Sequence, residues 1–298
     1  MTASIAIFGA NGLLAQPLID ALTSATFKSK VGSITVVTRE EPKQRHNGVE
    51  YVIADISNHD QVPQVVAALN GVDAIVGLNA PFPQVYAGIE AVLKQVKPKL
   101  YVPSQFGVDV PRAQQILPGF LSVKTDHSKA VRALGIKVVD VFTSLFHSPN
   151  GFSYEIVGHY GVDSDGSVTQ RGNPKQKISV TATGDVGKVV AALVTASDYS
   201  KLPDVVRVES DQVTPEEVQQ TWAKNHGKSL NVVKSIDQAE ALAEVQSDWK
   251  ANGFSPDKFL FYLHSLTSQG ANGGTLFVEN DNQLVNPGIW QWEKFHAA

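Results

Sequence analysis

Short runs of β-branched and apolar residues alternate with longer segments in which apolar residues recur every three or four positions. The first pattern is typical of buried strands, and the second of helices packed on one face. This alternation predicts a doubly wound α/β fold with a parallel sheet. Strands are predicted at residues 5–8, 33–38, 49–53, 72–77, 99–103 and 136–142, and helices at 13–22, 61–69, 85–96 and 120–134.

The alternation weakens after residue 150, where Gly, Asn, Asp and Pro cluster between residues 148 and 177. A helix is predicted at residues 183–195, with its Asp185 explained as a capping group. Another begins at Thr214, and helical stretches follow through about residue 268. We therefore expect a nucleotide-binding domain of residues 1–150, to which helix 183–195 returns, and a smaller mixed lobe of residues 151–298.

Composition narrows the class of protein. The chain has 298 residues, a net charge of −4 and no cysteine. Disulfides, thiolate metal sites and a cysteine nucleophile are therefore excluded, and no metal is expected. There is no basic run, so nucleic acid is not expected as a partner. No apolar run is long enough to cross a bilayer, and the first strand leaves no room for a signal peptide, so we expect a cytoplasmic protein with no membrane partner.

A glycine pattern follows the first strand directly. Gly9, Gly12 and Ala15 are spaced by three residues, and a helical segment begins there. A strand, a glycine turn and a helix N-terminus together form a cradle for phosphate groups, because free N–H groups and the helix dipole attract anions. This context predicts a dinucleotide-binding Rossmann fold. Cofactor contacts are expected from Gly9, Asn11, Gly12, Leu13 and Leu14.

The end of the second strand indicates which dinucleotide binds. An acidic residue there would hold the ribose hydroxyls of NAD, whereas an arginine would hold the 2′-phosphate of NADP. Arg39 occupies that position and Lys43 follows closely, although Glu40 and Glu41 partly neutralise them. The sequence therefore favours NADP(H) as cofactor, with Arg39 and Lys43 among its contacts.

Lys124 is the candidate for proton chemistry. It lies at the edge of the apolar face of predicted helix 120–134. A lysine in that position either extends its ammonium group to solvent or is partly desolvated, with its pKa lowered toward a value useful for proton transfer. Residues 101–109 lie at the carboxyl end of the fifth strand, at the sheet edge where ligands of such folds collect.

These features resemble the isoflavone reductase/NmrA-like family, the atypical short-chain dehydrogenases that include pinoresinol-lariciresinol and phenylcoumaran benzylic ether reductases. The turn Gly9-Ala-Asn-Gly12 is similar to the family's G-A-T-G, and residues 103–109 (PSQFGVD) to its P-S-E-F-G-x-D. Lys124 has the family's spacing to the following Gly135-Ile136. The resemblance covers about the first 150 residues well and the remainder loosely. Asn11, Ala15 and Gln105 depart from it, replacing threonine, glycine and glutamate.

The resemblance implies an NADP-dependent oxidoreductase that transfers a hydride between NADP(H) and a small, aromatic or polycyclic metabolite. Lys124 would contact the nicotinamide ribose and act as general acid or base, and Arg39 would bind the 2′-phosphate. The implied cofactor contacts also include Asn79, Ser104, Gln105 and Phe106.

The family's substrate cleft is mostly apolar and lies between two lobes. The candidates to line it here are Phe82, His127, Phe146, His147 and Phe152. His127, one turn beyond Lys124, is also a candidate for proton transfer. Residues 259–266 and the tryptophans at 290 and 292 are interpreted as a lid or a partner surface.

Two alternatives stay open. NmrA-like proteins can bind the dinucleotide without turnover and act as redox sensors through a protein partner. Bound NADP can also assist an isomerisation. A homodimer is compatible with either alternative and with the reductase.

Overall fold

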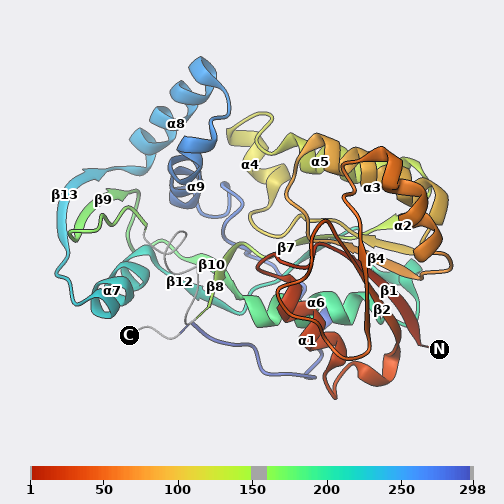
Figure 1. The fold of residues 1–298 in the computed structure, drawn as a ribbon. Coiled ribbons are helices and arrows are strands. Elements are labelled where there is room, and N and C mark those ends of the chain that lie inside the picture. Colours follow the sequence, from red (N-terminus) through yellow and green to blue (C-terminus); the bar gives the residue numbers. More distant parts are fainter. Residues whose placement is uncertain (1, 149–159, 296–298) are drawn as a thin grey trace.

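A six-stranded parallel sheet lies at the centre of the first half of the chain (Figure 1). The structure, a computed structural model, describes residues 2–148 and 160–295. The strand order is β3-β2-β1-β4-β5-β6, so the direction of winding reverses between β1 and β4. The predicted doubly wound parallel sheet is confirmed. Its strands are Ala3–Phe8 (β1), Val31–Thr38 (β2), Val49–Ile53 (β3), Ala74–Gly77 (β4), Leu100–Val102 (β5) and Lys137–Val138 (β6).

Side chains of β1 alternate between two hydrophobic cores. Ile5 and Ile7 pack in the core that contains α1 and α6, whereas Ala6 and Phe8 pack in the core that contains α2 and α3. Successive side chains of a strand point to opposite faces, and here both sets are apolar. Both faces of the sheet are therefore covered by helices (Figure 1). The helices of this part are Ala15–Thr23 (α1), Val62–Ala68 (α2), Pro83–Val96 (α3), Val110–Ile116 (α4), Ser122–Ala133 (α5) and Thr183–Val194 (α6), with short 3₁₀ turns at Lys28–Lys30 (η1) and His59–Gln61 (η2).

Helix α6 lies beyond residue 150 in the sequence, yet it packs on α1. Gly187 permits this close approach, because a Cβ atom there would stand only 2.3 Å from the carbonyl oxygen of Pro17. The helix thus belongs to a layer of the central sheet. The division of the chain near residue 150 stays a prediction.

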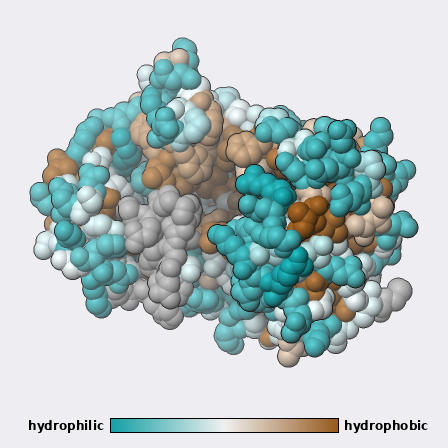
Figure 2. Space-filling model, in the orientation of Figure 1, coloured by the Kyte–Doolittle hydropathy of each residue, from teal (hydrophilic) through white to brown (hydrophobic). Residues whose placement is uncertain are grey.

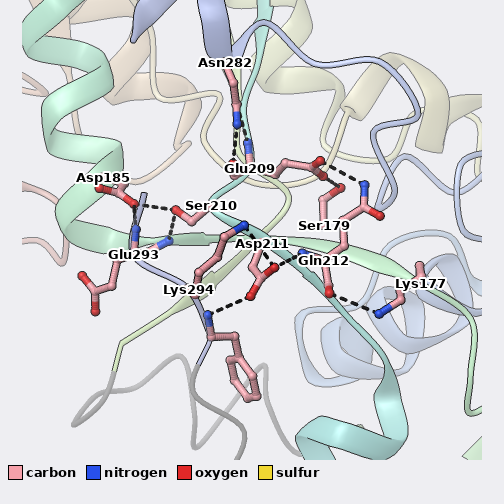
Figure 3. Close-up of polar contacts among 12 residues, drawn as sticks. Lys177, Ser179, Asp185, Glu209, Ser210, Asp211, Gln212, Asn282, Glu293 and Lys294 are labelled. Carbon is pink, nitrogen blue, oxygen red and sulfur yellow. Dashed lines mark hydrogen bonds and ion pairs between the residues drawn. The ribbon is translucent and has the colours of Figure 1, made fainter. Parts of the chain in front are cut away.

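The capping role predicted for Asp185 is wrong. Among the described residues no side chain caps the first turn of α6. The buried Asp185 carboxylate instead accepts hydrogen bonds from Ser210 Oγ and the backbone N–H of Glu293, both at 2.7 Å (Figure 3). Asp211 accepts in the same way from the N–H of Phe295, at 3.1 Å. These two carboxylates fasten the C-terminal segment to the rest of the molecule.

Smaller sheets and further helices make up the rest of the chain. The strand orders are β12-β10-β8, β11-β7 and β13-β9, and β10 pairs in parallel with β8 but antiparallel with β12. The predicted smaller mixed part is confirmed. Among the described residues, every helix is too short or too polar to span a membrane. The strands are Asp140–Phe142 (β7), Leu145–His147 (β8), Ser167–Arg171 (β9), Ile178–Ala182 (β10), Val205–Arg207 (β11), Asp211–Val213 (β12) and Asn231–Ile236 (β13); the helices are Pro215–His226 (α7), Gln238–Asn252 (α8), Phe259–Ser268 (α9) and Asn282–Val285 (α10), with 3₁₀ turns at Tyr199–Lys201 (η4) and Pro256–Lys258 (η5).

Three predictions of local structure differ from what is observed. The strand predicted at residues 136–142 divides into β6 and β7, because β7 leaves the central sheet to pair with β11. No element was predicted for the segment that carries Phe146 and His147, but it forms β8. The helical region predicted beyond Thr214 is interrupted by β13, which pairs with β9.

One side of each C-terminal tryptophan is used for packing within the chain. Trp290 and Trp292 are partly buried and pack against the core that contains α1 and α6. The ring of Trp290 lies 6.1 Å from that of Phe27, edge to face. Their role as a lid or a partner surface, together with residues 259–266, stays a prediction.

Candidate functional site

The turn after β1 requires glycine at its first position. Gly9 has a φ of +104°, a conformation that residues with a side chain rarely adopt. Its N–H donates to the carbonyl of Val37 at 2.9 Å, and a Cβ atom on Gly9 would stand 3.4 Å from the carbonyl oxygen of Leu78. The turn is therefore held between the ends of β2 and β4, where the winding of the sheet reverses. Ligands of this class of fold bind at that point.

Helix α1 begins directly after the turn. Its N-cap is Leu14, and no side chain of the described residues caps it. The N–H groups of Ala15 and Leu18 already donate to the carbonyls of Gly12 and Leu14, at 3.2 and 3.1 Å, so among the described residues of this first turn the N–H of Gln16 is left available to an anion. Ala15 is fully buried, as a residue that packs helix against strand must be. Pro17 lies in the first turn, where its missing N–H costs no helical hydrogen bond.

A cleft of about 580 Å³ opens beside this turn. It collects residues from the ends of β1, β2, β3 and β4 and from the start of α3. Six of the predicted cofactor residues line it, and so does Phe82, which we had assigned to the substrate. The residues that line this cleft include Gly9, Asn11, Gly12, Arg39, Lys43, Asp55, Asn79 and Phe82.

Two polar side chains in this cleft fit a dinucleotide. Asn79 Oδ1 is buried and, among the described residues, has no hydrogen-bond partner, so it can accept from a bound ligand. Asp55 was missed by the sequence analysis, although it follows directly on β3 at the ligand-binding edge of the sheet. Hydrogen bonds from the hydroxyl and N–H of Ser57 lower the pKa of Asp55. Its carboxylate thus stays ionised and accepts hydrogen bonds.

The cations at the mouth of the cleft lie on the loop between β2 and β3. The side chain of Arg39 is 76% exposed, and its nearest acid, Glu40, is 3.9 Å away. Glu41 is engaged instead by Arg45, at 2.7 Å. Arg39 therefore keeps a guanidinium group that can bind phosphate. Lys43 lines the same cleft.

Lys124 lies in the first turn of α5 and is partly buried. Within the described part of the chain, its ammonium group has no recorded hydrogen bond or ion pair. Burial lowers the pKa of Lys124 from its usual range to about 8. A lysine with such a pKa exchanges its proton near neutral pH.

Gln105 supports the turn that carries Lys124. Its side chain is 1% exposed, and Nε2 donates to the carbonyl of Lys124 at 3.0 Å and to Ser128 Oγ at 2.9 Å. Ser128 in turn donates to Asp140 Oδ1 at 2.7 Å. Gln105 thus lies behind Lys124 and does not line the described cleft. Its predicted contact with the cofactor stays a prediction.

His127 occupies a buried structural position. Nδ1 lies 2.7 Å from Glu90 Oε1, Nε2 lies 2.9 Å from the hydroxyl of Tyr101, and the ring stacks on Tyr86. Both ring nitrogens are engaged in the core between α3 and α5. This arrangement does not bring His127 together with Lys124 at a substrate, and it favours packing over the predicted substrate role.

The other predicted residues are dispersed. Leu13 is exposed, and Ser104 is partly buried after β5. Leu14, Phe106 and Phe146 pack in or against the core that contains α1 and α6. Burial lowers the pKa of His147, whose Nε2 has no hydrogen-bond partner in the described part of the chain. Phe152 lies outside the described residues. The ligand contacts of all these residues stay predictions.

The motif at residues 103–109 ends on a carboxylate that joins distant parts of the chain. Asp109 is fully buried, and its Oδ2 accepts from both Nε and Nη2 of Arg207 at 2.8 Å. Its Oδ1 accepts from the N–H of Arg112 and so caps α4. The aspartate of the motif is therefore structural, although the motif lies at the sheet edge where a ligand was expected.

The fold and the cleft together define a class of protein. A parallel sheet whose strand order reverses beside a glycine turn, with a cleft over the ends of its strands, is typical of dinucleotide-binding Rossmann proteins. Within that class the chain belongs to the NmrA-like family, whose family model matches residues 1–248. The predicted family is confirmed, and the match extends well past residue 150.

Solved structures of similar fold cover nearly the whole chain at low identity. A crystal structure of isoflavone reductase is 18% identical, covering 98% of this chain and 96% of its own, with a TM-score of 0.68. The leucoanthocyanidin reductase–NADPH complex from Vitis vinifera is 18% identical over 92% and 89%, with a TM-score of 0.67. AtPrR2 with NADP⁺ and (+)pinoresinol is 17% identical over 99% and 91%, with a TM-score of 0.61. No curated protein sequence matches the chain significantly.

Proposed function

We propose that this protein is an NADP(H)-dependent reductase that acts on a small aromatic or polycyclic metabolite, with Lys124 as its general acid and base. The observation that carries the proposal is the Lys124 ammonium group, which is partly buried, has no recorded partner among the described residues and has a pKa of about 8. The same chain carries a glycine turn that can bind the pyrophosphate of NADP and a cationic loop that can bind its 2′-phosphate. The structural neighbours crystallised with NADPH or NADP⁺ support the same cofactor.

Each part of the cleft has a role in holding the cofactor. The N–H groups of Gly12 and of Gln16, at the start of α1, would bind the pyrophosphate. Arg39 and Lys43 would bind the 2′-phosphate, and Asn79 Oδ1 would accept a hydrogen bond from the ligand. When bound, the nicotinamide supplies or accepts the hydride.

Lys124 would supply the matching proton. In the reductive direction the protonated ammonium donates to the substrate atom that gains negative charge as the hydride arrives. In the oxidative direction the neutral amine takes the proton back. One hydride and one proton complete a two-electron reduction, and a pKa near 8 lets one side chain serve both directions.

Aromatic and aliphatic surface supports the class of substrate. Phe82 is 55% exposed at the cleft, and Phe259 and Leu260 are exposed on α9. Figure 2 shows a hollow between the sheet and the C-terminal elements, with hydrophobic surface gathered beneath α8. Planar ligands bind well in such surroundings. The neighbour AtPrR2 was crystallised with pinoresinol, itself an aromatic compound.

Replacing Lys124 tests the proposal. NADPH oxidation is first measured with a panel of aromatic carbonyl and ether compounds to find a substrate. Lys124→Met should then lower kcat by about 10²–10⁴-fold, because the proton donor is lost, while the Kd for NADPH measured by calorimetry stays close to that of the wild type. Lys129→Met is the matched control, since Lys129 is an exposed lysine on the same helix.

Two outcomes would contradict the proposal. Full turnover by Lys124→Met would remove its acid–base role. NADPH binding with no turnover on any compound, together with a protein partner that distinguishes NADPH from NADP⁺, would favour the redox sensor.

A further inference from the structure

The cations that would select NADP are carried by an irregular, exposed loop. Residues 39–48 form no helix or strand, and the side chains of Arg39 and Arg45 are 76% and 56% exposed. An exposed loop of this kind is mobile unless something fixes it. Placing Arg39 and Lys43 over the cleft therefore requires ties to the rigid part of the molecule.

The tie nearest these two cations comes from a side chain of the glycine turn. Asn11 Oδ1 accepts a hydrogen bond from the backbone N–H of Lys43 at 2.9 Å, and Asn11 Nδ2 donates to the carbonyl of Glu41 at 3.3 Å. Asn11 lies in the middle of the glycine turn, which is itself held between β2 and β4. The amide thus bridges the phosphate cradle to the centre of the cationic loop.

The start of the loop is held separately. The hydroxyl of Thr38, at the end of β2, donates to the carbonyl of Glu40 at 2.9 Å. With Glu40 and Glu41 fixed through their carbonyls, and with the Glu41 carboxylate engaged by Arg45, the loop directs Arg39 and Lys43 to the cleft that both line.

We propose that Asn11 is a positioning residue that sets the preference for NADP over NAD by fixing this loop. The inference deepens the proposed function, since it rests on NADP(H) binding in the cleft. It differs from the predicted direct contact between Asn11 and the cofactor. A direct contact with the pyrophosphate would serve both dinucleotides equally, because both contain that group. A tie to the loop serves only the ligand with the 2′-phosphate.

The experiment measures Kd for NADPH and for NADH by calorimetry on the purified full-length chain. Asn11→Ala and Asn11→Leu both remove the two hydrogen bonds, and Asn11→Leu keeps the number and branching of the side-chain heavy atoms. Each should weaken NADPH binding by about tenfold and leave NADH binding nearly unchanged. Retained NADH binding also shows that the variant is folded.

A second background separates positioning from contact. In Arg39→Ala/Lys43→Ala, which lacks both cations, adding Asn11→Ala should leave the ratio of the two Kd values unchanged. An equal loss for NADPH and NADH in the single variants would overturn the inference and indicate direct contact with the pyrophosphate. A further loss of preference in the triple variant would overturn it as well. If the wild-type chain bound neither dinucleotide, the proposed function would fail together with it, whereas failure of Asn11 alone leaves that function standing.

Discussion

At the scale of single residues, burial is the main cause of the lowered pKa values of two side chains on α5. Lys124 and His127 lie one turn apart on α5, and burial lowers the pKa of both. Glu90 opposes that shift at His127 by hydrogen bonding to its ring, whereas Lys124 has no recorded partner within the described part of the chain. One residue is therefore engaged in the core, and the other is left for proton transfer.

The pKa of Lys124 predicts the pH dependence of the reaction. Below about pH 8 the lysine is protonated and can act as an acid, so kcat for reduction by NADPH should be constant there. Above that pH it should fall about tenfold per unit as the ammonium deprotonates. The reverse, oxidative reaction should rise through the same pH. Pre-steady-state rates measured across the range check this, and a profile that is unchanged in Lys124→Met would contradict it.

At the scale of elements, the sequence pattern predicted most of the central sheet. The strands β1 to β5 and the helices α1, α2, α3 and α5 were expected within a few residues of where they lie, because each has a clear apolar period. The hydrophobic pattern did not predict the strands whose formation depends on the strand they pair with. The change from β6 to β7 is not visible locally, since residues 136–142 (IKVVDVF) carry no glycine, proline or other turn signal between the two strands. Strand β13 is exposed along most of its length, so it lacks the alternation that reveals a strand.

The same limit applies to the site. Gly9, Gly12 and Arg39 were predicted because the glycine turn and the end of β2 follow a known spacing. Asp55 was missed because no motif marks it, and only its position after β3 brings it to the cleft. Gln105 was predicted to contact the cofactor because residues 103–109 resemble a motif of the family. Its hydrogen bond to Ser128 could not be predicted, because Ser128 is distant in sequence.

The contact between α1 and α6 gives a prediction for an element. Gly187→Ala should destabilise the protein by about 1–3 kcal/mol, because its Cβ would overlap the Pro17 carbonyl and neither backbone can yield easily. Gly184→Ala is the control in the same helix, since its Cβ would approach nothing closer than 3.8 Å. That change should be neutral or should stabilise by up to about 1 kcal/mol. Urea unfolding of both variants tests this, and equal effects would refute the packing argument.

At the scale of the whole molecule, Asp109 connects the two parts of the chain. Its carboxylate pairs with Arg207 on β11, and its backbone N–H donates to the carbonyl of Gly274 at 2.9 Å. The motif that ends on this residue also carries Gln105, which supports Lys124. The geometry of the site thus depends on how the two parts are held together.

Neutralising this carboxylate should be costly. Asp109→Asn should lower the free energy of unfolding by about 3–5 kcal/mol, since it leaves Arg207 without its buried partner. Asp204→Asn is the matched control, because Asp204 pairs with Lys137 at 2.6 Å but is 67% exposed. That change should cost less than about 1 kcal/mol. Denaturant titrations compare the two variants, and similar losses would show that burial of Asp109 contributes little.

The path of the C-terminal segment has a consequence for how the protein is made. One face of the central sheet is covered by α1 and α6, and Val285, Trp290 and Trp292 complete the same core. On the ribosome, the first 150 residues emerge long before these segments exist. Ile5, Ile7 and the apolar side of α1 then lack the neighbours that α6 and the C-terminal segment provide. This surface of the nascent chain therefore stays uncovered, and open to chaperones, until residue 292 has been synthesised.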